Sequence, residues 1–484
     1  MEILKKFTLT DFYEKYKNFI READQKGALE LLIPLFGKEE LELPHPLIPD
    51  VVGYCVQSKK IELTNIMYFM DEAGAHKWAI VQITSFINAV VIDDNCFVFM
   101  ASPVNIIESL FNKSNGYLWD FFKKEDVVVK KFGGFLVDQK RPYHFFYDAL
   151  VNAIEIDENV DGAFFYSGRE GDFIGVDKIF DKSYAGRAKE DESYAYPAII
   201  NGMRMFGKSQ KFMSQVFKME KFLINFHTPS YPDSKSLVNE VRNDVNRGSI
   251  AIWFGVSNGK RKWFQQVESC VFLVKALLNE NSSVVLLVDG HTSPQGEFND
   301  KNGDFDVFSF IQSELSSVKN VKIISLIGHD YVTKIETCKE VDFFVSYSGT
   351  GAFIPLRVCK KPGVVHKNES LFAFPDDYGG KVLLVEGEDF FDNKKKEKGR
   401  GFVDYKIPHE KIMQAILQLR LRGFLSCEVE TNSSLQKVLE KHGVAKSALP
   451  LFYDICDILS CYSPSATEVL SKNIEVMKSD LTHQ

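Results

Sequence analysis

Six short runs rich in Val and Ile, lying between residues 248 and 390, constrain the fold of this chain more than any other feature. Segments with the apolar spacing of helices separate these runs. Strands that alternate with helices form βαβ units, whose strands lie parallel in one sheet. The expected strands are residues 249–256, 283–289, 321–327, 341–346, 363–366 and 382–386. They predict a complete doubly wound α/β domain.

The connections between these runs fit that prediction. After the first run, one face of a helix is marked by Val267, Cys270, Val271, Val274, Leu277 and Leu278. Later connections contain helix-like segments at residues 306–315, 331–339 and 352–358. Each is long enough for a right-handed crossover between parallel strands.

The first half of the chain indicates a second α/β domain. Strand-like runs occur at residues 66–70, 78–84, 89–92, 96–100, 127–131 and 162–166, and helix-like spacing at 145–154 and 199–219. A segment rich in Pro and hydroxyl residues follows at 227–236. We therefore expect an N-terminal domain at 1–227, a linker region at 228–247, a Rossmann-like domain at 248–406 and a helical segment at 407–484.

Composition excludes several classes of protein. With 45% hydrophobic and 26% charged residues among 484, the chain can bury sizeable cores and is not disordered in general. A net charge of −8 opposes whole-surface binding to nucleic acid. Eight cysteines without a CxxC pair favour a reduced, cytoplasmic setting.

Membrane contact is limited by the same composition. The N-terminal sequence lacks the apolar core of a signal peptide, and no apolar stretch approaches the ~18 residues of a spanning helix. Peripheral attachment at the inner face of a membrane stays open. The charge run at residues 394–400 would then contact an anionic surface, although a solvated loop is the simpler interpretation.

A basic loop follows the first expected strand of the second half. Residues 257–263, SNGKRKW, place Lys260 and Arg261 between a strand end and a helix start. Helix N-termini offer oriented N–H groups to anions, and the two cations add full charges, so this loop is suited to a phosphate. The spacing of Gly255 and Gly259 does not match a Walker loop. The alternative is a solvated basic turn.

Three other strand ends carry candidate ligand contacts. The turn after the fourth expected strand, SYSGTG, contains Ser348, Gly349 and Thr350, whose small side chains let an anion approach the backbone. Asp289 ends the second expected strand and His366 the fifth. An ordinary turn, or a histidine satisfied within the structure, is the competing interpretation at each position.

The run from residue 341 to 368, VDFFVSYSGTGAFIPLRVCKKPGVVHKN, has a strand, a small-residue turn, a helix and a Lys-Pro-Gly step before the next strand. In this it resembles nucleotide-sugar glycosyltransferases with two Rossmann-like domains facing across a cleft, the GT-B architecture. Among these, it is similar in style to heptosyltransferases and protein O-glycosyltransferases. The resemblance covers about residues 248–424. It implies a donor-binding C-terminal domain and an acceptor-side N-terminal domain.

The resemblance also implies a reaction. A sugar would pass from a nucleotide-activated donor to a glycan, or to a lipid-linked or protein-linked acceptor. Many retaining members carry a Glu-x7-Glu motif across the donor helix, whereas residues 349–363 contain no acidic residue, so inversion is expected. Lys260, Arg261, Ser348 and Thr350 would stabilise the leaving group.

No cofactor beyond the donor substrate and no metal are expected. The sequence Asp304-Phe305-Asp306 has the letters of an Asp-x-Asp metal motif. It lies at an expected helix start, however, where Asp is favoured as a cap, and we interpret it as structural.

The general base is expected from the N-terminal domain. His144 and Asp148 are four residues apart at a probable helix start, where a carboxylate can orient an imidazole. An aromatic core stripe with polar edges is the alternative. Arg141, Arg169 and Glu170 are acceptor-side candidates, and Asp71, Glu72 and Asp172 are further carboxylates at strand ends or in loops.

Two other functions stay open on the sequence. One is another nucleotide-sugar enzyme, such as an epimerase, on the same architecture. The other is a non-catalytic module that binds a nucleotide or a partner protein, because a fold does not by itself confer chemistry.

Overall fold

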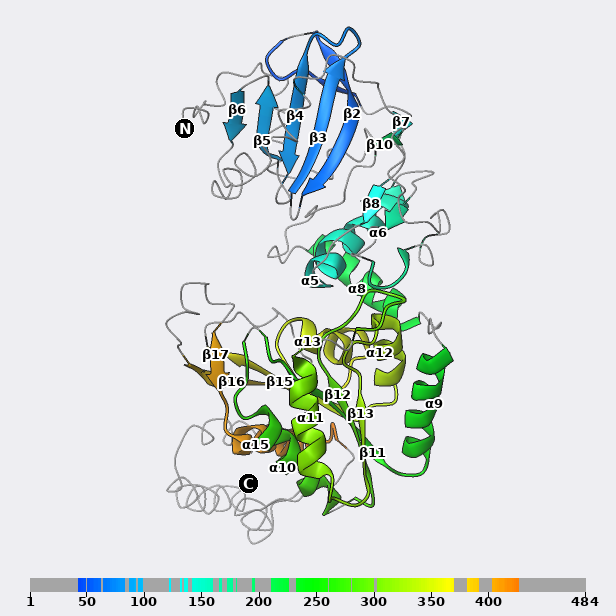
Figure 1. The fold of residues 1–484 in the computed structure, drawn as a ribbon, viewed down its shortest axis with the longest axis vertical. Helices are drawn as coiled ribbons and strands as arrows, with labels where there is room; N and C mark the ends of the chain where they lie inside the picture. The colour runs from blue at the N-terminus through cyan, green and yellow to red at the C-terminus, as the bar shows by residue number, and fades with distance from the viewer. Residues whose placement is uncertain are drawn as a thin grey trace, which may run out of the picture. The chain divides into compact units, whose positions relative to one another are not determined.

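The chain divides into two compact units, Met1–Asn225 and Phe226–Gln484, close to the expected boundary at residue 227 (Figure 1). Each unit is considered separately below. The computed structural model describes residues 42–48, 50–61, 64–82, 87–92, 95–98, 122, 131–132, 135–137, 142–159, 165–167, 172–176, 180, 194–195, 210–225, 232–259, 261–279, 281–299, 303–369, 381–390 and 403–425.

The C-terminal unit is built on a seven-stranded sheet in the order β13-β12-β11-β14-β15-β16-β17. Six strands pair in parallel and β17 runs antiparallel to β16. Read in chain order, the parallel strands have the 3-2-1-4-5-6 arrangement of a Rossmann-like domain, as predicted. The strands are β11 (Ile250–Gly255), β12 (Val284–Asp289), β13 (Val321–Ser325), β14 (Phe343–Tyr347), β15 (Gly363–Asn368), β16 (Val382–Phe390) and β17 (Asp404–Lys406).

Helices cover both faces of this sheet. Alternate residues of the central strands, such as Ile252 and Phe254, share one buried core with helices α10 (Gln266–Leu278), α11 (Asp304–Leu315) and α15 (His409–Leu421). Helix α9 (Pro232–Asn246) contacts β11, β12 and α12 (Tyr331–Cys338) (Figure 1). Strands buried on both faces read as continuous apolar runs, which is why they were recognisable in the sequence.

Most of the predicted linker region at 228–247 is a helix in the structure. Residues Pro232–Asn246 form α9, in which Val238 and Val241 are buried. A proline is tolerated in the first turn of a helix, where its missing N–H would have had no partner, so the Pro-rich composition did not mark a loop.

The N-terminal unit contains a six-stranded antiparallel sheet in which each strand pairs with the next in sequence. In its central strands, residues 66–70 and 78–81 are all buried. Such runs resemble parallel-sheet strands, and the sequence did not distinguish the two. The strands are β1 (Glu42–Pro44), β2 (Val52–Ile61), β3 (Thr64–Asp71), β4 (Lys77–Gln82), β5 (Ile87–Ile92) and β6 (Asn95–Val98).

A parallel crossover follows in the same unit and has the βαβ connectivity of Rossmann-like domains. Strand β8 (Phe135–Val137) leads through α5 (Pro142–His144), η2 (Phe145–Leu150) and α6 (Val151–Asn159) to β9 (Phe165–Ser167). Strands β8 and β9 pair in parallel. A second parallel pair joins β7 (Lys131–Phe132) to β10 (Tyr194–Ala195), and α8 (Gln210–Asn225) ends the unit. Both units therefore belong to the mixed α/β class that was expected.

Within the described ranges, no helix is both long and apolar enough to cross a membrane. The charge run at 394–400 and the part of the predicted C-terminal helical segment beyond Leu425 lie outside the described residues. Of that segment, the structure describes α15.

A close approach of β11 and β14 predicts the effect of one substitution. A Cβ added at Gly255 would lie 2.1 Å from Ser346 Oγ. Gly255→Ala should therefore destabilise the protein by about 1–3 kcal/mol through overpacking. In urea unfolding, the double variant Gly255→Ala/Ser346→Gly should lose less stability than the sum of the two single losses. Strict additivity would contradict this contact.

Candidate functional site

The carboxyl ends of β11 and β14 bring two of the predicted loops together. The two strands are neighbours, with Phe254 paired to Val345, and Gly255 lies against Ser346 near their carboxyl ends. Strand β14 also pairs with β15, which places Tyr347 beside His366. The basic loop and the SYSGTG turn thus lie at one edge, where open α/β sheets bind their ligands.

Side chains from two helix starts hold the basic loop in place. The Gln266 amide pairs with the backbone of Ser257, accepting from its N–H at 3.0 Å and donating to its carbonyl at 3.2 Å. Asp304 Oδ1 accepts from the N–H of Asn258 at 2.7 Å. Further along the loop, the N–H of Lys262 donates to Asp404 Oδ1 at 2.8 Å. The backbone on both sides of Arg261 is therefore fixed.

Arg261 carries a cation that no described carboxylate pairs with. Its backbone is in the left-handed region, with φ of 61°, which is uncommon for a residue with a side chain. A Cβ built on Gly349 would lie 3.8 Å from one terminal guanidinium nitrogen and 3.9 Å from the other. The Arg261 Nε is buried and has no hydrogen-bond partner among the described residues. The guanidinium therefore lies beside the SYSGTG turn with donors to spare.

Two buried tyrosines lie near this cation without neutralising it. Burial raises the pKa of Tyr347 and of Tyr405, and the charge of Arg261 opposes part of each rise. Both phenols consequently stay protonated near neutral pH. Arg261 thus keeps its full charge for a ligand.

The SYSGTG turn supplies hydroxyl groups that lack partners. Ser346 and Ser348 are buried, and neither Oγ has a hydrogen-bond partner among the described residues. Gly349 has φ of 101° and ψ of −137°, a conformation essentially restricted to glycine. The N–H of Ser348 donates to the carbonyl of His366 at 2.7 Å, which fixes the turn, and Thr350 begins α13 (Thr350–Ala352). Buried hydroxyls without partners are uncommon and mark a place where polar contacts remain to be made.

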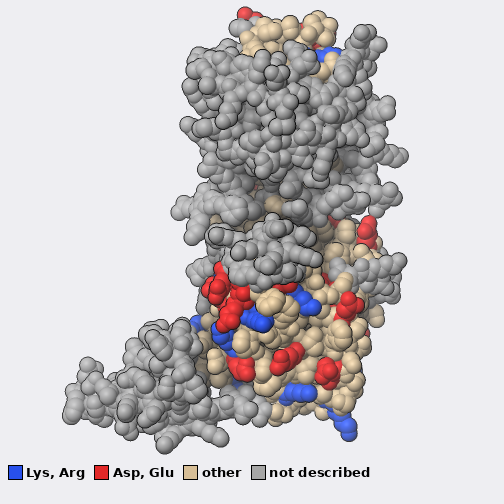
Figure 2. Space-filling model, turned by 60° about the vertical axis from the view of Figure 1, so that its left-hand side comes forward, with Lys and Arg blue, Asp and Glu red and all other residues tan. Residues whose placement is uncertain are grey.

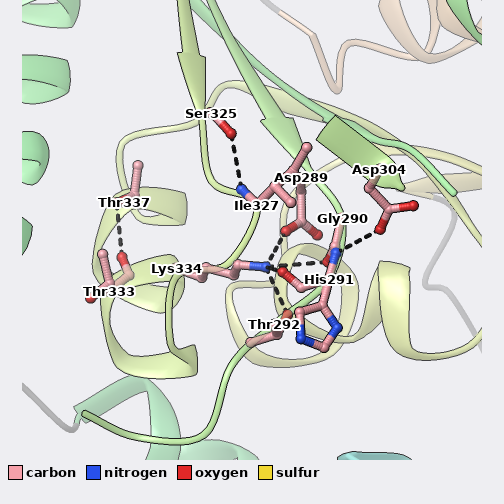
Figure 3. Close-up of polar contacts among 10 residues, drawn as sticks. All are labelled: Asp289, Gly290, His291, Thr292, Asp304, Ser325, Ile327, Thr333, Lys334 and Thr337. Carbon is pink, nitrogen blue, oxygen red and sulfur yellow. Dashed lines mark hydrogen bonds and ion pairs between the residues drawn. The ribbon is translucent and has the colours of Figure 1, made fainter. Parts of the chain in front are cut away.

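A buried lysine pairs with Asp289 inside the unit, which argues against the predicted ligand contact by Asp289. Lys334, from α12, is fully buried and lies 2.6 Å from Asp289 Oδ1 (Figure 3). The same Nζ donates to the carbonyl of Gly290 at 3.2 Å, to that of His291 at 2.9 Å and to Thr292 Oγ1 at 2.7 Å. Burial raises the pKa of Asp289 and lowers that of Lys334, and each charge offsets part of the other's shift. Asp289 is therefore part of the scaffold.

Asp304 joins this loop to the basic loop. Its Oδ2 accepts from the N–H of His291 at 2.9 Å, while its Oδ1 holds Asn258. The Asp304-Phe305-Asp306 sequence was interpreted as structural, and in the structure Asp304 begins α11 and binds backbone amides. Among the described residues, no group of three His, Cys, Asp or Glu side chains could hold a metal ion.

His366 lies inside the unit, so the predicted direct contact with the donor does not fit its placement. Its side chain is 1% exposed, and Trp263 packs on its ring with centroids 4.4 Å apart. Its Nδ1 lies 2.8 Å from the Tyr405 hydroxyl. Burial lowers the pKa of His366 to about 3, so the ring is neutral at physiological pH. His366 supports the turn from behind.

The acceptor-side predictions remain predictions. His144 ends α5, and its ring contacts the edge of the Tyr143 ring. Asp148 lies in η2, a π-helical segment, and its pairing with His144 stays a prediction. Arg141, Arg169, Glu170 and, in the basic loop, Lys260 lie outside the described residues.

Two of the other carboxylates cap turns. Asp71 Oδ1 accepts from the N–H of His76 at 3.0 Å in the turn that follows β3. Asp172 accepts from the N–H groups of Gly175 and Val176 at 2.7 and 3.0 Å. Backbone capping is the common role of Asp in such turns.

Charge on the described surface agrees with the composition. On the face shown in Figure 2, Lys and Arg side chains of the C-terminal unit lie among Asp and Glu side chains. Such mixing differs from the extended basic face of a nucleic-acid-binding protein.

Comparison with known proteins gives structural similarity alone: no family model and no curated protein matches the chain. E. coli ADP-heptose LPS heptosyltransferase II is 13% identical, with a TM-score of 0.28, over 41% of this chain and 54% of its own. A family 9 glycosyltransferase from Veillonella parvula is 12% identical, with a TM-score of 0.30, over 67% of this chain and 82% of its own. UDP-GlcNAc 2-epimerase from Neisseria meningitidis is 14% identical, with a TM-score of 0.28, over 67% of this chain and 76% of its own.

One of these structures is a heptosyltransferase, a kind of protein that residues 341–368 resemble in sequence pattern. The chain spans about half the length of the heptosyltransferase. At TM-scores of 0.28–0.30 they decide neither the fold nor the activity. The Rossmann-like class of the C-terminal unit rests on its own strand order.

The buried ion pair predicts a difference between two variants. Lys334→Met should cost about 3–5 kcal/mol in unfolding free energy, because it leaves the Asp289 carboxylate buried without a countercharge. Asp289→Asn/Lys334→Met removes both charges and should be more stable than Lys334→Met in urea denaturation. A double variant no more stable than Lys334→Met would show that Asp289 does not need the lysine.

The low pKa of His366 predicts a loss of stability in acid. As the pH falls below 6.5, His366 becomes protonated in the unfolded chain, whereas in the folded protein it stays neutral until about pH 3. From pH 7 to pH 5 this group should lower the unfolding free energy by about 2 kcal/mol. His366→Gln, whose amide can still bond to Tyr405, should show a fall smaller by that amount in urea titrations. Equal falls in the two proteins would place a protonatable His366 in the folded state.

Proposed function

We propose that the C-terminal unit binds the diphosphate of a nucleotide-activated sugar, and that the chain is a glycosyltransferase that moves this sugar to an acceptor hydroxyl. The observation that carries the proposal is the Arg261 guanidinium, unpaired among described residues and adjacent to Gly349. A fixed cation next to a glycine turn with spare hydroxyls is suited to a phosphate group, because it offers charge, donors and close backbone approach.

The proposed chemistry uses these groups on the leaving group. The acceptor oxygen forms a bond to the anomeric carbon as the bond from that carbon to the diphosphate oxygen breaks. The bonding electrons stay on the diphosphate, where Arg261 and the hydroxyl of Ser348 stabilise the added negative charge. A base removes the proton of the acceptor hydroxyl. Attack from the opposite side of the ring inverts the anomeric centre.

In the proposed reaction, side-chain cations stabilise the leaving diphosphate. Arg261 supplies charge that a divalent ion supplies in metal-dependent transferases. Lys260, the next residue along the basic loop, is proposed to add a second cation. His144, with Asp148, remains the predicted base, and the acceptor class is defined only by its hydroxyl.

Removing the Arg261 charge tests the proposal. Arg261→Gln keeps a side chain of similar length and should weaken binding of UDP, ADP, GDP or CDP, whichever binds the wild type, by roughly 10- to 150-fold. Isothermal titration calorimetry measures this, with inorganic pyrophosphate as a second probe. Arg247→Gln, which makes the same change at a 77%-exposed arginine side chain in the turn after α9, is the matched control and should change nothing.

Turnover separates an enzyme from a binding protein. The wild type should release free sugar slowly from the cognate nucleotide sugar without an acceptor, also in EDTA, and Arg261→Gln should lower that rate. Unchanged nucleotide affinity in Arg261→Gln would overturn the assignment of the site. Binding without any turnover would leave a nucleotide-binding module.

A further inference from the structure

An irregular segment after β12 is held firmly against the turn that follows β13. Residues 291–299 and 328–330 are joined by four hydrogen bonds. The N–H of Gly328 donates to the carbonyl of His291 at 2.8 Å, and the N–H of Ser293 donates to the carbonyl of His329 at 3.2 Å. The N–H of Asn299 donates to the carbonyl of Gly328 at 3.3 Å, and the N–H of Gly296 donates to Asp330 Oδ2 at 3.3 Å.

A glycine at the contact makes this arrangement specific. Gly328 has φ of 82°, and a Cβ there would lie 2.3 Å from the carbonyl oxygen of Asn299. Any side chain would both strain the backbone and push the two segments apart. The two segments therefore form one rigid element at the ligand edge of the sheet.

This element presents an aromatic pair to solvent. The Phe298 ring is 58% exposed and meets the His329 ring with centroids 5.1 Å apart. Single exposed apolar side chains are ordinary on protein surfaces. Phe298 differs because its backbone neighbours are fixed and because a second ring supports it.

The position of this pair relates it to Arg261. The pair follows β12 and β13, whereas Arg261 follows β11, and these three strands are adjacent. Two strand spacings separate β13 from β11 by about 10 Å, measured across the sheet. A nucleotide has an aromatic base at one end, phosphates at the other and a ribose between them. It could therefore contact the Phe298–His329 pair with its base and Arg261 with its phosphates.

We propose that Phe298 and His329 form a stacking seat for the base of the nucleotide whose diphosphate lies at Arg261. This inference rests on the proposed function. Phe298 contributes an apolar ring face, and every nucleobase has a face that can stack on it. Burial and the nearby charge of Lys334 lower the pKa of His329, so its neutral ring can both donate and accept a hydrogen bond at neutral pH.

A comparison of a nucleotide with a probe that has no base tests the seat. In calorimetry on the full chain, Phe298→Ala should weaken the best-bound nucleoside diphosphate of UDP, ADP, GDP and CDP by about 5- to 150-fold. Binding of inorganic pyrophosphate should not change. Phe298→Trp should retain nucleotide binding. Phe310→Ala is the matched control, since Phe310 lies on α11 and is 64% exposed.

The outcomes separate this inference from the proposed function. Unchanged nucleotide affinity in Phe298→Ala would overturn the stacking seat, and so would equal losses for nucleotide and pyrophosphate, which indicate a disturbed phosphate site. If Arg261→Gln still weakens pyrophosphate binding in either case, the phosphate site stands without the base seat. A wild type that binds neither probe would overturn both proposals.

Discussion

The ligand edge of the C-terminal unit depends on one buried cation, Lys334. Its ammonium group pairs with Asp289 and holds the carbonyl of His291. The N–H of His291 in turn donates to Asp304, whose other oxygen holds the basic loop at Asn258. A continuous set of polar contacts therefore runs from α12 to the loop that carries Arg261. Because such networks are stable only when every member is satisfied, this part of the edge is rigid.

The remaining part of the edge has the opposite character. At the end of β14 the hydroxyls of Ser346 and Ser348 and the Nε of Arg261 lack partners among the described residues. An unsatisfied buried polar group costs free energy, and structures keep such groups mainly where function requires them. What distinguishes the candidate site is that such groups occur here together with the Arg261 cation, unpaired in the described part of the chain, and the Gly349 turn.

Much of the C-terminal unit could be predicted from sequence, since apolar strands, four of them almost wholly buried, and amphipathic crossovers leave strong periodic signals. The proximity of Arg261 to Gly349 could also be expected from sequence, because neighbouring parallel strands bring the loops that follow them together. Lys334 could not be recognised, since a lysine within a helical pattern normally faces solvent. The burial of His366 depends on Trp263 and Tyr405, which are distant in sequence. Such contacts leave no local pattern.

The division of labour within the chain follows from where charges lie. The described groups at the ends of β11 and β14 are a cation and neutral donors, and residues 349–363 contain no acid. Groups of this kind stabilise a departing diphosphate, but they cannot accept the proton of an attacking hydroxyl. If the chain transfers sugars, its base therefore has to come from outside this pair of loops. In the proposed reaction, the C-terminal unit would therefore bind the nucleotide and stabilise its departure, and deprotonation of the acceptor would need a group outside these two loops.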